Sequence, residues 1–191
     1  MYAAFDDPYC YPGTDVLVNS MDLRDPAELE AFEEEMVRTR ADEPLPRGRL
    51  TARHFRAVHR HLFQDVYGWA GEIRTVRISK GGNPFCYPEY IAPQLKSLFA
   101  WLRDRDCLRG LEQDAFCAAA AHFLSELNVI HAFRDGNGRA QLAFMAEIAR
   151  RAGHPLDLAL IEPDGFLHAM IASYHGDTKP LTDTLASLIR R

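Results

Sequence analysis

The chain has 191 residues, 47% of them hydrophobic and 26% charged, a balance that supports a folded core and excludes a fibrous or broadly disordered protein. Its 22 Lys and Arg residues against 27 Asp and Glu residues give a net charge of −5, which excludes a domain-wide basic surface, so we expect no nucleic acid as a substrate. Uncharged runs are far shorter than the ~20 apolar residues of a membrane helix, and no secretory signal is visible, so we expect a cytoplasmic protein without membrane contact.

The first part of the chain predicts an arm and two helices. Residues 1–25 contain turn-forming residues and no long periodicity, which indicates an ordered N-terminal arm. Asp25-Pro26 is a helix start signal, and apolar residues then recur at helical spacing over residues 26–41. After a Pro-rich break, Thr51 begins a second helix, which Gly68-Trp69-Ala70-Gly71 closes.

Residues 73–88 predict a β-hairpin, because β-branched residues alternate along them before the turn signal Gly81-Gly82-Asn83. An exposed hairpin edge can bind an extended segment of another protein as an added strand. This flap is therefore a candidate docking site for a protein target. An ordinary surface hairpin, with Lys80 as a solvated edge charge, is the alternative.

The remaining chain is helical in pattern. Apolar residues recur at helical spacing over residues 88–105, 111–129, 136–152, 163–174 and 179–190. Within the second of these segments, residues 115–124 are apolar on nearly every side, which is typical of a helix buried all round. We therefore expect an all-α fold, a helical bundle with a small β-hairpin flap, as a single domain over residues 26–191.

Three histidines lie close together in the second predicted helix, at His54, His59 and His61. Only His54 and His61 share a helix face, and no carboxylate joins them, so we expect no metal site there. The four cysteines lack the spacing of metal ligands, and we expect reduced thiols.

One segment concentrates groups that can do chemistry, His131-Ala132-Phe133-Arg134-Asp135-Gly136-Asn137-Gly138-Arg139. Gly136, Asn137 and Gly138 can take positive φ or approach a ligand closely, at a point where a helix begins with unpaired N–H groups. Such a helix start favours phosphate, and Arg139 in the first turn adds a charged fork. The pattern therefore predicts an anion cradle.

Two further side chains of this segment suit a reaction at phosphate. Asp135 offers a hard oxygen ligand to a Mg²⁺ ion chelated by phosphates, and His131 can accept a proton from a hydroxyl near neutral pH. A plain interhelical loop, with Asp135 as a cap and His131 as a core histidine, is the alternative interpretation. An ordinary interhelical loop rarely requires all of these residue types within nine positions, so the segment favours the functional interpretation.

The same segment resembles the signature of Fic-domain proteins, His-Pro-Phe-x-(Asp/Glu)-Gly-Asn-Gly-Arg-x-x-Arg. Residues 66–74 and 78–82 resemble the stretch that leads into the flap hairpin of that family, and residues 174–181 resemble its closing segment. The resemblance spans about residues 10–188. It implies an all-α fold with a small hairpin, in agreement with the residue pattern.

Resemblance to Fic-domain proteins implies a protein adenylyltransferase, which transfers AMP from Mg²⁺-bound ATP to a Ser, Thr or Tyr hydroxyl of a target protein. His131 is then the general base, Asp135 the Mg²⁺ ligand and Phe133 a buried anchor of the loop. The residues that would bind the nucleotide are Gly136, Asn137, Gly138 and Arg139 of the motif, with Lys80 and Gly81 of the flap.

Two positions depart from the signature. Ala132 replaces the usual Pro, a change that we expect to be tolerated. Leu142 replaces the second Arg, which in the family reaches the γ-phosphate and pairs with an inhibitory Glu. The alternatives are therefore a transferase of the same fold with another donor (UTP, CDP-choline or phosphate transfer) or a catalytically weak module that binds nucleotide or target. Gly138 argues against a Doc-type kinase, whose motif has Lys there.

The resemblance to Fic-domain proteins also implies that an inhibitory glutamate restrains the enzyme. The inhibitory helix of the family reads (Ser/Thr)-x-x-x-Glu-(Gly/Asn), and the nearest match is Thr39 to Glu43, where Pro44 follows and a helix could not continue. We therefore expect a separate small antitoxin-like protein to supply the glutamate, near the helix that contains Arg139. The compartment is expected to be the cytoplasm, of the producing cell or, after delivery, of a host or target cell.

Overall fold

The computed structural model describes residues 7–190; residues 1–6 of the expected arm and Arg191 lie outside the described residues. The helices of this part are α1 (Pro26–Ala41), α2 (Ala52–Phe63), α3 (Pro88–Arg103), α4 (Gln113–Ile130), α5 (Asn137–Ala152), α6 (Pro163–Tyr174) and α7 (Lys179–Leu188), with short 3₁₀ turns η1 (Asp106–Leu108) and η2 (Leu158–Leu160). The strands β1 (Ser79–Lys80) and β2 (Asn83–Pro84) form a two-stranded antiparallel sheet. The predicted all-α fold with a small hairpin is confirmed.

The first two helices begin where local capping chemistry places them. The Asp25 carboxylate accepts hydrogen bonds from the first-turn N–H groups of α1, and Thr51 accepts one from the N–H of His54 in α2. The end of α2 differs from the prediction: it stops at Phe63, because the N–H groups of both Val66 and Tyr67 bond to the Phe63 carbonyl and turn the chain. The residues up to Gly71 are therefore a turn segment and not helix.

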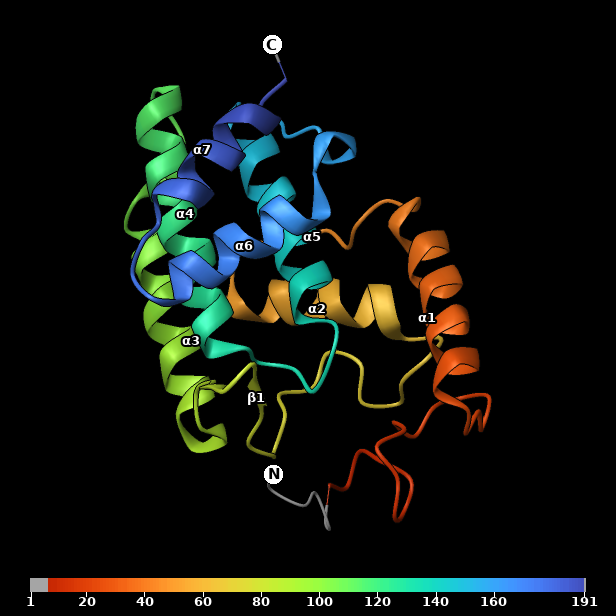
Figure 1. Cartoon of the computed structure of the whole chain (residues 1–191). Helices are drawn as coiled ribbons and strands as arrows, with labels where there is room; N and C mark the ends of the chain where they lie inside the picture. The colour runs from red at the N-terminus through yellow and green to blue at the C-terminus, as the bar shows by residue number, and fades with distance from the viewer. Residues whose placement is uncertain (1–6, 191) are drawn as a thin grey trace.

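Helix α4 contacts α3, α5, α6 and α7, and Figure 1 shows it along the left side of the bundle, beside α7. Its residues Phe116, Phe123 and Leu124 are fully buried. The prediction of a helix that is buried all round is wrong for one face, because Ala118 and His122, which lie one turn apart, are exposed. In residues 7–190, none of the helices is both long and apolar enough to span a bilayer.

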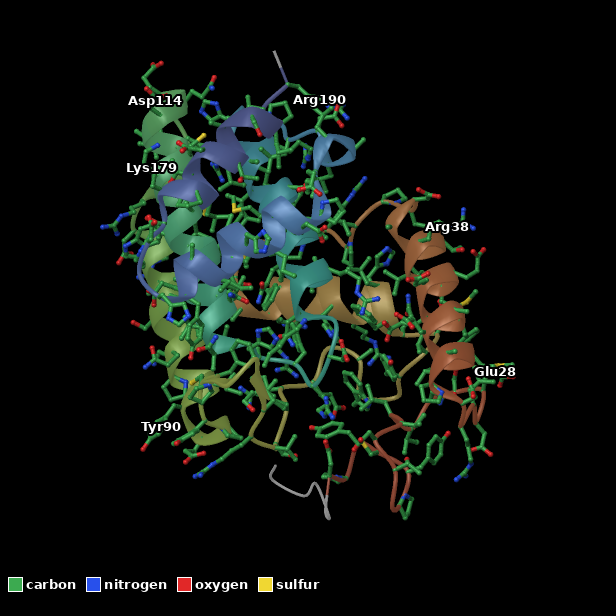
Figure 2. All side chains as sticks on the ribbon, viewed as in Figure 1. Glu28, Arg38, Tyr90, Asp114, Lys179 and Arg190 are labelled. Atoms are coloured by element: carbon green, nitrogen blue, oxygen red, sulfur yellow. The ribbon has the colours of Figure 1, made fainter. Side chains whose placement is uncertain are left out.

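The N-terminal arm and α1 form the edge of the molecule. Tyr11, Val16 and Leu17 of the arm are buried, and α1 packs on α2. The outer side of α1 is polar, and its labelled side chains Glu28 and Arg38 point away from the bundle (Figure 2). The hydrophobic core therefore extends through the arm to this edge of the molecule.

The flap is smaller than predicted. Pairing is limited to Ser79 with Pro84 and Lys80 with Asn83, whereas the rest of residues 73–88 has no ladder partner. The reason is Arg74, whose side chain is 1% exposed and turns inward to backbone carbonyls near the end of α4. A segment anchored in this way follows the helix end and does not extend the hairpin.

Candidate active site

His131 ends α4 in an unusual backbone conformation. Its φ of 46° and ψ of 63° are left-handed, and its N–H bonds to the Leu127 carbonyl. A non-glycine residue rarely adopts this region, so the surrounding structure must hold it there. The conformation turns the chain from α4 into the loop that carries Asp135 and ends at α5.

The hydrogen bond of the His131 ring fixes its tautomer. Nδ1 lies 3.1 Å from the Asn128 carbonyl oxygen, and a carbonyl oxygen can only accept. Nδ1 therefore carries the proton, and the lone pair is on Nε2. A histidine in this state can accept a proton at Nε2.

The flap covers one face of the same ring. Phe85, directly after β2, stacks on His131 with ring centroids 3.7 Å apart and planes at 12°. Tyr174 of α6 meets Phe85 edge-on, and its hydroxyl donates to the Pro84 carbonyl. Stacking uses the ring face, whereas the Nε2 lone pair lies in the ring plane, so the proton-accepting edge is not blocked by this contact.

Burial sets the charge of His131. Desolvation is the main cause of a pKa lowered to about 4. The hydrogen bond to Asn128 raises the pKa, and the positive charge of Arg74 lowers it. His131 is therefore neutral at physiological pH, which is the state that a general base requires.

Arg74 holds this end of α4 to the flap. Its guanidinium donates to the carbonyls of His131 (2.7 Å), Val76 (2.6 Å) and Cys86 (2.5 Å), and burial lowers its pKa. The carbonyls at a helix C-terminus have no intrahelical partners, so a buried cation that binds them stabilises both the helix end and the left-handed turn.

His59 holds the other side of the loop. Its Nδ1 accepts a hydrogen bond from the Gly71 N–H and its Nε2 donates to the Asp135 carbonyl, both at 2.9 Å. The ring is fully buried; it stacks on Phe63, with centroids 4.7 Å apart, and packs at a tilt against Phe133, with centroids 3.8 Å apart. Desolvation lowers its pKa to about 4, so His59 is a neutral bridge between two backbone segments.

The predicted buried anchor, Phe133, is fully buried, and Asn137 clamps it. The Asn137 side chain accepts from the Phe133 N–H (2.9 Å) and donates to the Phe133 carbonyl (2.8 Å). The Asn137 side chain therefore closes the loop, and the part of Asn137 in an anion cradle, through its backbone N–H, stays a prediction.

Helix α5 begins with an open end. Gly136, the residue before its first turn, has φ 73°, and a Cβ there would lie 2.3 Å from Cζ of Phe63, so this position requires glycine. Gly138 has no heavy atom within 4 Å of a built Cβ, so free space lies beside it. Among the described residues, no side chain caps the N–H groups of the first turn. These groups and the helix dipole favour an anion.

Asp135 and Arg139 lie at this helix start. The Asp135 carboxylate is 49% exposed and lies 3.7 Å from Arg139. Arg139 also forms an ion pair of 2.6 Å with Glu33 of α1, a side chain that is 12% exposed, and Tyr67 donates a hydrogen bond to the same carboxylate. The motif arginine is therefore already paired with a carboxylate that no sequence pattern predicted.

The carboxylate side chains of the described residues suit a Mg²⁺ ion that binds together with the phosphates of a substrate. No group of three or more His, Cys, Asp or Glu side chains within residues 7–190 could hold a metal by itself. Mg²⁺ commonly binds one or two protein carboxylates together with substrate phosphates and water. The single exposed carboxylate of Asp135, next to an open helix N-terminus, suits that arrangement.

Two of the predicted nucleotide-binding residues, Lys80 and Gly81, lie in the flap hairpin and not in the motif. Lys80 is exposed, and its charge contributes to the low pKa of His131, whereas Gly81 forms the hairpin turn with φ 58°. Leu142 is half-buried, one turn along α5 from Arg139. The structure thus brings His131, the loop and the α5 start together and leaves the two flap residues at the rim.

The residues that support the site differ in how far a sequence pattern could predict them. His59 lies four positions from both Phe55 and Phe63 on the apolar face of α2, a pattern that indicated burial but not its two backbone partners. Nothing in the sequence distinguishes Arg74 from an exposed cation. His54 and His61 bond to the carbonyls of other segments, through Nε2 in each case.

A family profile and several known proteins match the chain. The profile described as Fic/DOC family matches residues 49–149. A probable protein adenylyltransferase of Sinorhizobium fredii is 50% identical, with 98% of each chain covered. The probable protein adenylyltransferase Fic of Escherichia coli is 38% identical over 92% of this chain and 88% of its own.

Solved structures share the fold. The BepC protein of Bartonella tribocorum, a VirB-translocated effector solved with bound AMPPNP, superposes with a TM-score of 0.86 at 28% identity and covers 98% of each chain. The N-terminal Fic domain of a Bartonella quintana effector with bound ADP gives a TM-score of 0.86 at 28% identity, over 96% of this chain and 94% of that one.

Proposed function

The chain belongs to the Fic/DOC family, and from this premise we propose that it is a protein adenylyltransferase, which transfers AMP from ATP to a hydroxyl side chain of a target protein. Relatives of 50% and 38% identity that bear the name of this activity over nearly the whole chain support the proposal. So do the nucleotide-bound structures of the same fold.

The observation that carries the proposal is the state of His131. Its Nδ1 is engaged by Asn128, and its pKa is about 4, so Nε2 is a free acceptor at neutral pH. In the proposed reaction, Nε2 accepts the proton of the target hydroxyl while its oxygen forms a bond to the α-phosphorus. The bond from that phosphorus to the bridging oxygen breaks, and pyrophosphate leaves.

The start of α5 is the proposed site for the phosphates. Its uncapped N–H groups and the guanidinium of Arg139 would bind them, with Gly138 leaving space for close approach. Asp135 would hold a Mg²⁺ ion, which supplies charge neutralisation at the phosphates. Lys80 and Gly81 would contact the nucleotide from the flap.

A second candidate is a weak catalyst or a transferase with a different donor. Two observations favour it: Leu142 provides no charge where the family signature has Arg, and Arg139 is paired with Glu33. Both reduce the positive charge available to a triphosphate. UTP, CDP-choline and phosphate transfer are the alternative donor chemistries.

The proposed partners are a target protein and an inhibitor. The target docks at the flap, whose Phe85 lies on His131, so that a segment bound to the hairpin is held near the base. Glu43 lies beyond the end of α1 and is exposed, which supports a separate antitoxin-like chain as the source of an inhibitory glutamate.

For the compartment we propose the cytoplasm. Delivery into a host or target cell is the alternative. It is supported by the two Bartonella proteins of the same fold, which are VirB-translocated effectors.

Labelled ATP with Mg²⁺ and a cell lysate tests the transferase proposal. Replacing His131 by Asn removes the base while keeping a residue that tolerates left-handed backbone, so the fold should persist. We expect the label on target protein to fall by roughly 10²- to 10⁴-fold. His131→Ala should behave alike, and His168→Ala, at an exposed position, is the matched control. Wild-type label transfer by a folded His131→Asn protein would refute the role of His131.

A further inference from the structure

A second concave surface lies away from the motif. It is a groove of about 1030 Å³ between the start of α2, the side of α3 and the end of α5. Its contribution from α5 is Arg151, twelve positions from Arg139, which corresponds to about 18 Å along a helix. The groove is therefore separate from the proposed phosphate site.

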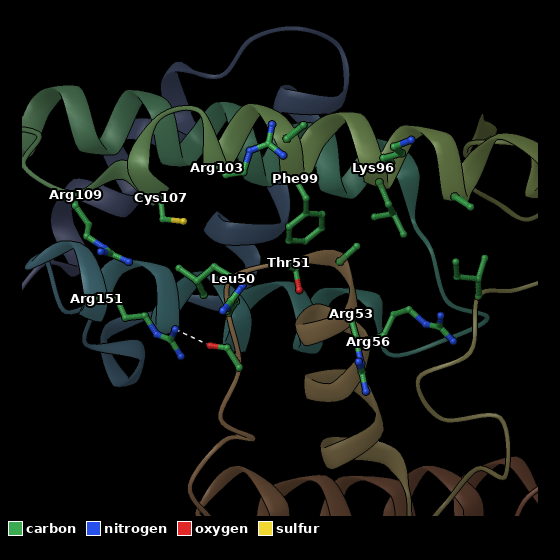
Figure 3. A pocket seen from close by; sticks show the side chains of 17 residues that line it. Leu50, Thr51, Arg53, Arg56, Lys96, Phe99, Arg103, Cys107, Arg109 and Arg151 are labelled. Atoms are coloured by element: carbon green, nitrogen blue, oxygen red, sulfur yellow. Dashed lines mark hydrogen bonds between the residues drawn. The ribbon is translucent and has the colours of Figure 1, made fainter.

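The floor of this groove is apolar. It is lined by Leu50, Leu95 and Phe99, each at most 6% exposed, together with Ile73, which is half-buried, and Ala92, which is exposed. Figure 3 shows Leu50 and Phe99 facing the same space from the two sides. An apolar floor favours a ligand that brings apolar groups of its own.

The rim of the groove is strongly cationic. Arg109 and Arg151 lie at one end and Arg53 and Arg56 toward the other (Figure 3). The remaining cations of the rim are Arg49, Lys96 and Arg103. Seven of the 22 Lys and Arg residues of a chain with a net charge of −5 thus line one groove, and no Asp or Glu lines it.

Several of these charges have no ion-pair partner. Within residues 7–190, Arg49, Arg53 and Lys96 form no ion pair, and all three are exposed. By contrast, ion pairs join Arg103 to Asp104, Arg109 to Asp106 and Arg151 to Glu147, and Arg151 also donates to the Gly48 carbonyl. The unpaired cations give the groove a positive field that a complementary anionic partner would satisfy.

We propose that this groove binds an acidic amphipathic helix of a partner protein. The part of α3 that lines it, from Ala92 to Arg103, extends about 16 Å, which matches three turns of a docked helix. Apolar side chains at positions i, i+3, i+4 and i+7 would lie on the floor, and carboxylates on both flanks would meet the rim. The transferase activity is not required for this proposal.

Nucleic acid fits the same surface less well. Phosphates would satisfy the cations, but the apolar floor would gain no partner, and among the residues that line the groove only Phe99 is aromatic. Binding of single strands commonly uses exposed aromatic rings on which bases stack. The chemistry of the groove therefore favours a polypeptide.

Fluorescence anisotropy with defined probes tests the proposal. The probe is a labelled 16-residue helical peptide with Leu at i, i+3, i+4 and i+7 and Glu on both flanks; its controls are the same peptide with Gln for Glu and a 12-nucleotide oligo-dT. We expect the acidic peptide to bind tightest and to weaken as salt rises. Arg53→Glu with Lys96→Glu should weaken it roughly tenfold or more.

A charge reversal outside the groove distinguishes an effect of the groove residues on peptide binding from an effect of the net charge. Arg38→Glu with Lys179→Glu changes the net charge equally at exposed positions outside the groove and should leave peptide binding unchanged. Circular dichroism and the midpoint of urea unfolding report that each variant is folded, and the single change Lys96→Glu replaces the double variant if that protein does not fold. Three results would each overturn the proposal: equal binding of the Gln peptide, tighter binding of oligo-dT, or peptide affinity that the groove reversal does not change.

Discussion

The stability of this protein should fall sharply between pH 6.5 and pH 4, because His59 is buried as a neutral ring. Above pH 6.5 the ring is neutral in the folded and the unfolded chain, and no difference arises. Below that pH the unfolded chain binds a proton, whereas the folded chain does not until about pH 4, since desolvation lowers the pKa of His59. Acid therefore stabilises the unfolded state.

The magnitude follows from the pKa of His59. At pH 5, which is 1.5 units below the ordinary His pKa of 6.5, protonation of the unfolded chain lowers the free energy of unfolding by about 2 kcal/mol. The decrease levels off at about 3 kcal/mol below pH 4. His131 has the same lowered pKa and adds to the fall. Against a typical total of ~5–15 kcal/mol, the combined effect is large.

Urea denaturation at a series of pH values measures this effect, with His59→Phe as the key variant. Phe keeps a ring between Phe63 and Phe133 but leaves the Gly71 N–H and the Asp135 carbonyl without partners, at about 1–3 kcal/mol each. The variant should be less stable at pH 7, yet lose about 2 kcal/mol less than wild type between pH 7 and pH 5. Equal losses in the two proteins would show that His59 titrates normally in the folded chain and would refute the reasoning.

Four further predictions concern the proposed reaction. The acid limb of kcat/KM should lie near pH 4, the pKa of His131, and a limb near pH 6.5 would show that the ring is solvated. Leu142→Arg should tighten ATP·Mg²⁺ binding by about ten- to a hundredfold in calorimetry, because it restores a charge-assisted contact; equal affinities would mean that position 142 does not face the donor. Gly136→Ala should unfold more readily in urea, because a Cβ there overlaps Phe63, whereas Gly138→Ala should fold normally and bind ATP more weakly. Glu33→Gln should strengthen ATP binding several-fold, and an unchanged Kd would show that its ion pair does not compete with phosphate.

Local chemistry in the sequence determined where the helices and the motif lie. Asp25 and Thr51 cap α1 and α2 as expected, because a capping side chain bonds to N–H groups two or three residues away. The apolar residues of α4 predicted a helix with little exposed surface, and Gly136 was predicted to tolerate the positive φ that it adopts before α5. Each of these features depends on residues within one or two turns of each other, so a pattern along the chain could report it.

Tertiary structure alone decided how the site is supported. His59 bonds to the carbonyl of a residue 76 positions away, Arg74 reaches the end of α4, and Glu33 of α1 pairs with Arg139 of α5. The tautomer of His131 was equally hidden, although its partner Asn128 is only three residues away, because the bond forms only when the chain turns left-handed. The pKa values of both histidines depend on burial, which packing of distant segments creates. A sequence pattern specifies which residues share a helix face, but desolvation and the pairing of remote polar groups exist only after the helices have packed.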